Sequence, residues 1–361
     1  MTSATINADF FTDLSHRWNA LLKDNAKLRI RNAAQELGVS EAELLSTRIG
    51  KGVVRLAGDF KSIITETQQL GSVMALTRND AIVHEKTGEY KNISVHGFMG
   101  LTLGEIDLRI FYNRFNYGFA VEETGEHGTR LSLQFFAANG EAVHKIYAND
   151  NTNLEAFHEL IKRHESDDQS LGLRLDAELI EKQKEGDLLN APADLDVATL
   201  RQDWSELKDV HHFQAMLSKH KIARIPTYQL VDEQYAQRLS NSAFEGALTL
   251  AAAQQLPIMV FVGSQGVIQI HTGTVTKLLR TGPWFNVLDP NFNLHANTEL
   301  IDQVWLVRKP TTDGLVSSLE LFDKNGSQLG LLFGERKPGK PELEGWRELL
   351  ATLAQDHVLG A

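Results

Sequence analysis

The chain has 361 residues, of which 42% are hydrophobic and 23% are charged, with a formal net charge of −11 and no cysteine. This length exceeds the usual size of one domain, so we expect two domains of ordinary size. The negative charge disfavours general nucleic-acid binding, which depends on cations that neutralise phosphates. Without cysteine, disulfides, thiolate metal sites and iron–sulfur clusters are excluded, and His, Arg, Lys, Tyr and carboxylates must carry any chemistry.

The N-terminus lacks the basic and apolar regions of a secretory signal. The longest apolar stretch, around Leu256 to Val262, has the length of a strand, whereas a membrane span needs about 20 apolar residues. We therefore expect a cytoplasmic protein that does not insert into a membrane.

The first half opens with a helical segment. Ser40, followed three residues later by Glu43, forms a capping-box pattern. The preceding Ala-x-x-Leu-Gly-Val-Ser pattern also fits a helix-turn-helix, with basic residues on both sides (Lys27, Arg29, Arg31, Arg48 and Lys51). Such patterns are common in plain helical hairpins, and the acidic chain makes a DNA-binding regulator the weaker alternative.

A long internal repeat follows. Residues 74–88 (MALTRNDAIVHEKTG) align with residues 259–273 (MVFVGSQGVIQIHTG) at an offset of 185. Residues 133–140 (LQFFAANG) align with residues 319–326 (LELFDKNG) at an offset of 186, and both end in Asn-Gly, the strongest short hairpin signal. We expect a type I′ turn there, with positive φ at both central residues. The repeat predicts an α+β fold by tandem duplication, each half being a large antiparallel sheet with flanking helices.

A polar, weakly periodic stretch separates the two copies and predicts a linker. We expect an N-terminal repeat half at residues 1–165, a linker at 166–194 and a C-terminal repeat half at 195–361. The copies differ mainly in polar residues, so function is sought where they diverge.

The second half is expected to begin with a helix from about residue 197 to 218. One of its faces carries residues at spacings of 4, 3 and 4, namely Leu200, Trp204, Leu207 and His211. A core histidine bonded to a backbone carbonyl is the simpler interpretation of His211. An imidazole presented from an apolar wall is also what an axial ligand of haem iron requires.

Three further groups could contact a ligand. Arg109 shares a strand face with Asp107 and Phe111, either as an edge-strand ion pair or as a cation above a ligand with Phe111 as an apolar contact. His84 lies on a strand where the other copy has Gln269. Arginines at the ends of second-half elements, Arg224 and Arg336, are either surface residues or holders of carboxylates.

The sequence also resembles a known family through several blocks in the same order: Arg78–Glu85, Asp107–Arg109, Asp209–His211, Ile258–Gly263 and Arg308–Gly314. It is similar to the haemin-degrading factor and cytoplasmic haem-transport family of Gram-negative bacteria, the HemS, HmuS, ChuS and PhuS type. The resemblance covers nearly the whole chain, including the duplication.

The resemblance implies haem as substrate or cargo. It implies that His211, in the C-terminal half, is the proximal ligand of the haem iron and that Arg109 approaches the iron from the opposite side, as the candidate catalytic residue. It further implies that Arg224 and Arg336 bind the propionates, and that His84 is a second haem contact in the first half.

Two positions depart from the family pattern. Phe333 stands where the family often has a tyrosine, and Gly282 replaces a lysine found in some relatives, with Arg280 close by as a substitute. Both departures concern the expected binding of the propionates, since Phe333 cannot hydrogen-bond a propionate.

Two function classes follow from the resemblance. In the first, the protein degrades haem oxidatively with an external reductant and releases iron. In the second, it is a carrier that receives haem from a haem ABC importer and passes it to a separate oxygenase or reductase. Both need the same pocket, and no Walker, His-Glu-x-x-His or Gly-x-Ser-x-Gly motif offers another chemistry.

Overall fold

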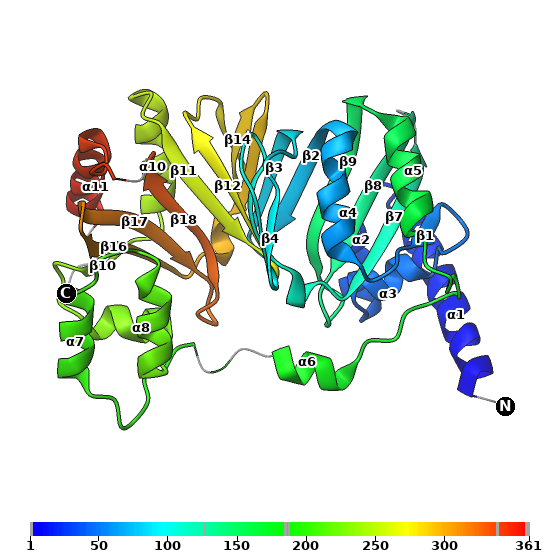
Figure 1. Ribbon diagram of the computed structural model, residues 1–361, viewed down its shortest axis with the longest axis horizontal. Helices are drawn as coiled ribbons and strands as arrows, with labels where there is room; N and C mark the ends of the chain where they lie inside the picture. The colour runs from blue at the N-terminus through cyan, green and yellow to red at the C-terminus, as the bar shows by residue number, and fades with distance from the viewer. Residues whose placement is uncertain (1–2, 126–127, 184–185, 187, 337–338, 358–361) are drawn as a thin grey trace. The chain divides into compact units, whose positions relative to one another are not determined.

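The computed structural model describes residues 3–125, 128–183, 186, 188–336 and 339–357 (Figure 1). The chain divides into two compact units. Unit 1 comprises Met1–Arg78, Glu85–Lys184 and Ser264–Gln269, and unit 2 comprises Asn79–His84, Glu185–Gly263 and Ile270–Ala361. The main division, between Lys184 and Glu185, falls inside the segment 166–194 that the sequence marks as a linker.

The described residues form two nine-stranded sheets, which confirms the predicted α+β class. Their orders are β1-β7-β8-β9-β2-β3-β15-β14-β13 and β10-β16-β17-β18-β11-β12-β6-β5-β4, so the strand order of one sheet repeats in the other. The strands of the first half are β1 (Val53–Arg55), β2 (Gly71–Arg78), β3 (Ile82–Glu89), β4 (Ser94–His96), β5 (Met99–Thr102), β6 (Asp107–Phe111), β7 (Tyr117–Gly125), β8 (Gly128–Phe136) and β9 (Ala142–Thr152). Those of the second half are β10 (Ala236–Leu239), β11 (Ile258–Gly263), β12 (Val267–Gly273), β13 (Leu278–Thr281), β14 (Trp284–Asp289), β15 (Phe292–Asn297), β16 (Gln303–Thr311), β17 (Gly314–Phe322) and β18 (Gln328–Gly334).

Helices flank both sheets. They are α1 (Ser3–Asp24), α2 (Ile30–Leu37), α3 (Glu41–Ser46), α4 (Phe60–Glu66), α5 (Leu154–His164), α6 (Ala177–Gln183), α7 (Val197–Ser205), α8 (His212–His220), α9 (Arg224–Leu230), α10 (Ala243–Ala253) and α11 (Glu344–Asp356), with 3₁₀ turns η1 (Thr67–Leu70), η2 (Tyr112–Arg114) and η3 (Thr298–Leu300). Within the described ranges, no helix combines the length and apolar character needed to cross a membrane.

The two Asn-Gly hairpins form, but with a different turn from the one predicted. In the β8–β9 turn only Gly140 has positive φ (75°), and in the β17–β18 turn only Gly326 does (84°). Each loop is closed by a hydrogen bond spanning five residues, from Ala137 N to Glu141 O in the first half (2.9 Å). This is the pattern of a type I turn followed by a left-handed glycine and a bulge, so the type I′ prediction is wrong.

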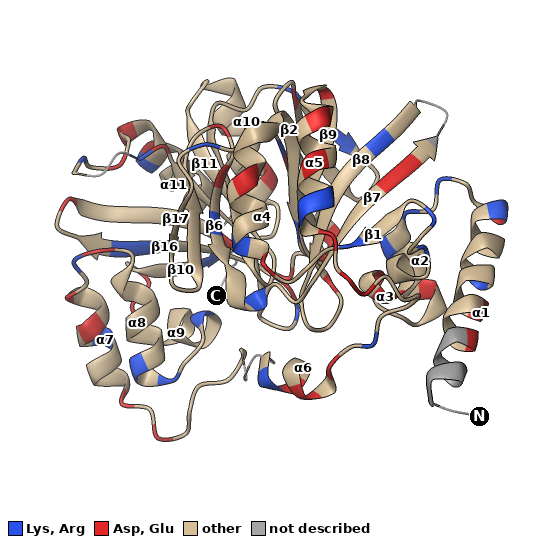
Figure 2. Ribbon diagram, turned by 45° about the vertical axis from the view of Figure 1, so that its right-hand side comes forward, with Lys and Arg blue, Asp and Glu red and all other residues tan. Residues whose placement is uncertain are grey.

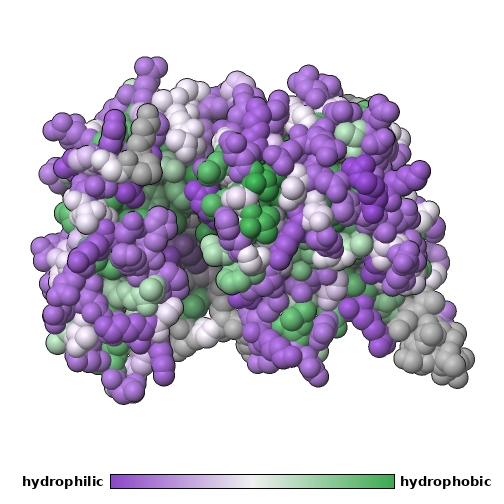
Figure 3. Space-filling view, viewed as in Figure 1, coloured by the Kyte–Doolittle hydropathy of each residue, from purple (hydrophilic) through white to green (hydrophobic). Residues whose placement is uncertain are grey.

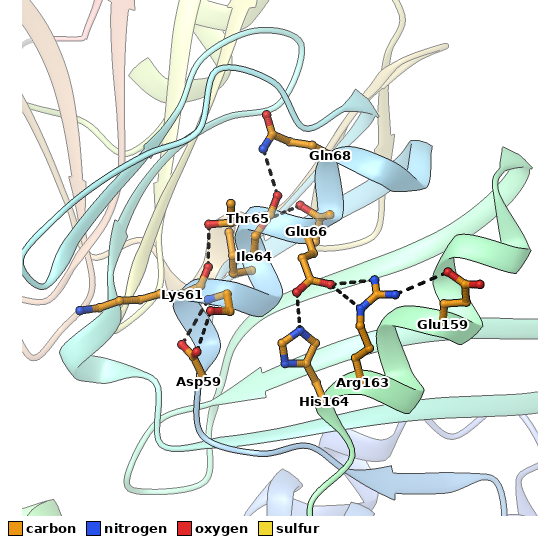
Figure 4. A network of polar contacts seen from close by, with 11 residues as sticks. Asp59, Lys61, Ile64, Thr65, Glu66, Gln68, Glu159, Arg163 and His164 are labelled. Carbon is orange, nitrogen blue, oxygen red and sulfur yellow. Dashed lines mark hydrogen bonds and ion pairs between the residues drawn. The ribbon is translucent and has the colours of Figure 1, made fainter.

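Helices α4 and α5 cover one face of β7, β8 and β9 in unit 1 (Figure 1). Their ends are joined by Glu66, whose carboxylate accepts hydrogen bonds from Arg163 Nη2 (2.8 Å) and from His164 Nε2 (2.9 Å) (Figure 4). This network ties one helix to the other. In unit 2, α10 and α11 pack Phe244 and Trp346 into the core of the second sheet.

Helices α2 and α3 form a short helical hairpin. Gly38 ends α2 in the left-handed conformation (φ 71°), and the capping box of Ser40 and Glu43 begins α3, as predicted. Figure 2 shows acidic and basic residues interspersed over this region, which is the charge pattern of an ordinary hairpin rather than of a phosphate-binding face.

The β4–β5 hairpin exposes several apolar side chains, Val95, Phe98 and Met99 among them. Figure 3 shows a hydrophobic area within an otherwise largely hydrophilic face, at the place that this hairpin has in Figure 1. The hairpin lies at the end of the second sheet, where β4 is the edge strand.

Candidate functional site

His211 lies between two helices rather than on the apolar face of one. Helix α7 ends at Ser205 and α8 begins at His212, so His211 is the residue that precedes α8. Its side chain is 88% exposed, whereas Leu200 and Trp204 are buried as predicted. The expected continuous helix to Ser218 is therefore wrong, and His211 is presented to solvent.

Asp209 forms the turn that leads into α8 and also fixes the imidazole. Its Oδ1 accepts a hydrogen bond from the His211 backbone N–H (2.8 Å) and one from His211 Nδ1 (2.5 Å). The backbone bond, and then the side-chain bond, hold the pKa of Asp209 below its usual value. Because an ionised carboxylate only accepts, Nδ1 carries the hydrogen and Nε2 keeps its lone pair for a ligand.

A cavity of about 660 Å³ lies in unit 2 along α8 and the segment that leads into α9. Gln214 and Leu217 of α8 line it, whereas His211, the residue before α8, is not one of its lining residues in the described part of the chain. Phe322 and Gln328 contribute from β17 and β18, and Arg224 from the start of α9. This volume is within the range of small-molecule sites, about 300–1,000 Å³, and its lining mixes apolar and cationic groups as such sites do.

Arg224 lines this cavity from within a buried polar network, and Lys221 is a second cation of the lining. Its Nη1 lies 3.5 Å from Glu320 Oε2 and 3.4 Å from the Tyr228 hydroxyl. The guanidinium also stacks over the ring of Phe213, with its carbon 5.0 Å from the ring centre. A guanidinium at an apolar cavity can bind a carboxylate through paired hydrogen bonds.

Arg336 follows β18 and is half-buried. Its buried Nε has no hydrogen-bond partner among the described residues. The neighbouring Phe333, at the position where the family has tyrosine, packs edge-on against Phe261 (ring centres 5.3 Å apart). Arg280 donates to Glu245 and to Thr298 Oγ1 (3.0 Å) on the surface, so its guanidinium is committed elsewhere.

Arg109 lies on β6 in unit 1 and donates a hydrogen bond to Asp107. Its side chain is 34% exposed. Burial raises the pKa of Asp107, and the facing guanidinium offsets part of that rise. The contacts of Arg109 therefore match its interpretation as a member of an ion pair. Phe111, on the same strand, is half-buried, and its backbone N–H donates to Gly266 O (2.8 Å).

His84 lies on β3, and the residue is fully buried in unit 2. Its ring contacts Phe292 (ring centres 4.9 Å apart), whose other neighbour is the stacked ring of His271 (3.8 Å). A haem contact at His84 would require the imidazole to separate from Phe292. The role of His84 as a second haem contact therefore stays a prediction, and its burial disfavours that role.

Sequence reasoning missed the residues behind Arg224. Glu320 is fully buried on β17, where it accepts hydrogen bonds from Lys309 Nζ (2.6 Å) and the Tyr228 hydroxyl (2.6 Å). Two-residue alternation in Ser318-Leu-Glu-Leu-Phe322 places Glu320 on the strand face opposite Leu319 and Leu321, where an exposed carboxylate is expected. No sequence signal marked its burial.

Comparison with known proteins shows to which protein family the chain belongs. The family model described as the haemin-degrading HemS/ChuX domain matches residues 38–164 and 221–353. The chain belongs to this family, as its sequence motifs indicated.

Individual relatives agree over nearly the full length. The haem-bound crystal structure of PhuS, a haem-binding protein from Pseudomonas aeruginosa, is 41% identical, with a TM-score of 0.90 over 95% of this chain and 99% of that chain. ChuS of Escherichia coli, described as a haem oxygenase, is 35% identical, with a TM-score of 0.84 over 94% and 99% of the two chains. The hemin transport protein HmuS of Yersinia pestis is 35% identical over 91% of this chain and 93% of its own.

Proposed function

We propose that the chain binds haem in unit 2, with Nε2 of His211 as the axial ligand of the iron, and opens the porphyrin ring oxidatively. The observation that carries this proposal is the His211–Asp209 pair, in which the 2.5 Å bond at Nδ1 orients the ring and leaves Nε2 to a ligand. The haem chemistry in the names of the relatives supports the choice of ligand.

Different residues of the cavity contact different parts of the haem in this proposal. Leu217 and Phe322 offer apolar surface that excludes water from the porphyrin. Arg224 receives one propionate through charged hydrogen bonds, and Arg336, with its buried Nε, receives the other. The same contacts hold haem whether it is degraded or passed on.

The oxidative step draws on two co-reactants. Dioxygen is the oxidant, and an external donor supplies the electrons and protons. The two bonds at one meso carbon break, that carbon leaves as a one-carbon product, and an open-chain tetrapyrrole and iron are released. Arg109 is the residue proposed to donate hydrogen bonds in this step, as the family resemblance implies.

A carrier function is the second candidate, and one observation favours it. The His211 side chain is 88% exposed, which suits rapid loading from an importer and transfer to a separate oxygenase or reductase. HmuS, named a transport protein, is consistent with this role. In either case the expectation that the protein works in the cytoplasm stays a prediction.

The experiment that tests the proposal follows the haem complex under ascorbate in air with catalase present. Loss of the Soret band with release of iron and a defined open-chain tetrapyrrole supports degradation. A Soret band that persists, followed by transfer to an added haem oxygenase, contradicts the degrading function and favours the carrier. Catalase removes free peroxide, so ring opening by that side reaction does not imitate the enzyme.

A further inference from the structure

Both halves of the chain have a charged residue at the first position of an equivalent helix, and the sign of that charge differs between the halves. Gly38 and Lys221 are both left-handed residues that end a helix, with φ of 71° and 51°. Three residues later, Glu41 begins α3 and Arg224 begins α9. The two positions are therefore structural counterparts, with a carboxylate in the first half and a guanidinium in the second.

The sheet position that faces Arg224 in unit 2 also has a counterpart in the first half. Gln134 on β8 and Glu320 on β17 occupy equivalent places at the offset of 186 residues. Both are buried, and each bonds the serine two residues earlier: Gln134 Nε2 donates to Ser132 Oγ (3.0 Å), and Ser318 Oγ donates to Glu320 Oε1 (2.9 Å). The charge has thus moved from the helix in one copy to the sheet in the other.

In unit 1 the arrangement is closed. The Glu41 carboxylate accepts hydrogen bonds from Lys145 and Arg78, and all three side chains are buried or nearly so. One carboxylate from the helix thereby satisfies both cations at this place. The first half has no need of an external anion here.

In unit 2 the arrangement is open. Glu320 accepts four hydrogen bonds, from Lys309 Nζ, Ser318 Oγ, the Tyr228 hydroxyl and Gln328 Nε2 (2.6–3.0 Å). A carboxylate has about four lone-pair sites. Arg224 is consequently left 3.5 Å from Glu320, too far for a short charged hydrogen bond, with 26% of its side chain exposed at the cavity.

We propose that Glu320, saturated by Lys309 and its other donors, is the positioning residue that presents Arg224 to the cavity and so makes this cavity selective for ligands with carboxylates. Lys309 and Arg224 together carry one positive charge more than Glu320, and this excess reaches the ligand through Arg224. The inference rests on the proposed function, in which those carboxylates are the haem propionates.

The test compares haem with its dimethyl ester, which keeps the iron and ring but lacks the propionate charges. The measured quantity is the ratio of the two dissociation constants, here called the ester/acid ratio. We expect wild type to favour the acid, and Arg224→Met to lower the ratio about 10-fold, the size of one charged hydrogen bond. Since both ligands share every other contact, a general loss of stability leaves the ratio unchanged.

The variant that isolates Glu320 is Glu320→Gln combined with Lys309→Met. It removes a buried charge pair together, and the glutamine is the residue that the first half carries at this place. We expect the ester/acid ratio to fall as far as in Arg224→Met, with no further fall when all three changes are combined. Tyr228→Phe, a milder variant, frees a lone pair of Glu320 for Arg224 and should lower the ratio in the same direction.

Glu342→Gln is the matched control, because Glu342 is a buried carboxylate of unit 2 that bonds Ser317 instead. Its ratio should equal that of wild type. A ratio that stays high in the double variant and in Tyr228→Phe, while Arg224→Met lowers it, would overturn the positioning role. An unchanged ratio in Arg224→Met overturns the inference as a whole. If wild type binds haem and its dimethyl ester equally well, the inference is overturned but the proposed function is not. If wild type binds neither form, both the inference and the proposed function are overturned.

Discussion

His211 and Asp209 act as a pair, since the carboxylate decides which ring nitrogen faces a ligand. A histidine that donates its other N–H to a carboxylate is held in one tautomer and one orientation, and becomes a better electron donor to iron. The same Asp209 oxygen also accepts from the His211 backbone N–H. Side-chain bonds of this kind are typical of turns, so one residue both forms the turn that leads into α8 and prepares the ligand.

Replacing Asp209 with Asn should weaken haem binding about 10- to 100-fold, the usual cost of losing such a partner of a metal ligand. Titration of haem followed at the Soret band measures the change. Asp203→Asn is the matched control, because Asp203 Oδ2 pairs with His220 Nε2 (2.6 Å), a histidine that is not proposed as a ligand. Equal affinities of the two variants would contradict the role of Asp209.

Arg109→Ala should leave folding intact, because this half-exposed pair with Asp107 contributes little to stability. We expect the variant to change the Soret position of the haem complex and to slow ring opening under ascorbate. Arg109→Lys should restore activity only in part, since an ammonium lacks the planar fork of donors. Wild-type spectra and rates in Arg109→Ala would remove this residue from the site.

At the scale of elements, the two repeated hairpins show that the Asn-Gly signal accompanies both the pairing of two strands and a shift in their register. Each hairpin has a register shift just before its turn, at Phe135/Phe136 in the first half and Leu321/Phe322 in the second. The turn glycine of the first hairpin lies against α3, since a Cβ at Gly140 would approach Ser40 Oγ to 2.2 Å. The turn thus helps to seat the capped end of α3.

Gly140→Ala should therefore destabilise the protein by roughly 2–4 kcal/mol, because strain at positive φ and a clash with Ser40 add together. Gly282→Ala separates the two terms: Gly282 has φ of 56° and open space around its Cβ position, so only the backbone cost of about 1 kcal/mol applies. Denaturant unfolding measures both. Similar losses in the two variants would show that the contact with Ser40 is without effect.

The sequence predicted where helices and strands occur better than it predicted the residues at which they end. The repeat located paired strands in both halves because hydrophobic alternation and Asn-Gly survive in each copy. It could not reveal that α7 stops at Ser205, since the spacing through Leu207 to His211 fits a helix. The burial of His84 was equally hidden, because its neighbour Phe292 is distant in sequence.

At the scale of the whole molecule, two buried titrating groups set the response to acid. Burial lowers the pKa of His144 from 6.5 to about 3. Burial alone would raise the pKa of Glu320, but Lys309 and Arg224 outweigh it and hold the value at about 2, against 4.5 ordinarily. In both cases the unfolded chain takes up a proton at a higher pH than the folded one, so stability falls as the pH falls.

The sign is the same for both groups, so the pH window distinguishes them. Between pH 6 and about 5, His144 is protonated in the unfolded state only, while Glu320 is ionised in both states. Below pH 6.5 the free energy of unfolding should decrease with a slope that approaches about 1.4 kcal/mol per pH unit for His144. His144→Gln should flatten this window in urea unfolding, whereas the exposed His16→Gln should not. A slope unchanged in His144→Gln would contradict the assignment.

The central claim, that the chain binds haem through His211, is tested most directly by titrating ferric haem into wild type, His211→Ala and His212→Ala. The adjacent His212 is also exposed but is the first residue of α8. We predict one haem per chain with a histidine-ligated spectrum in wild type and in His212→Ala. In His211→Ala, affinity should fall strongly or the ligation should change. Equal affinities and identical spectra in the two variants would contradict the account.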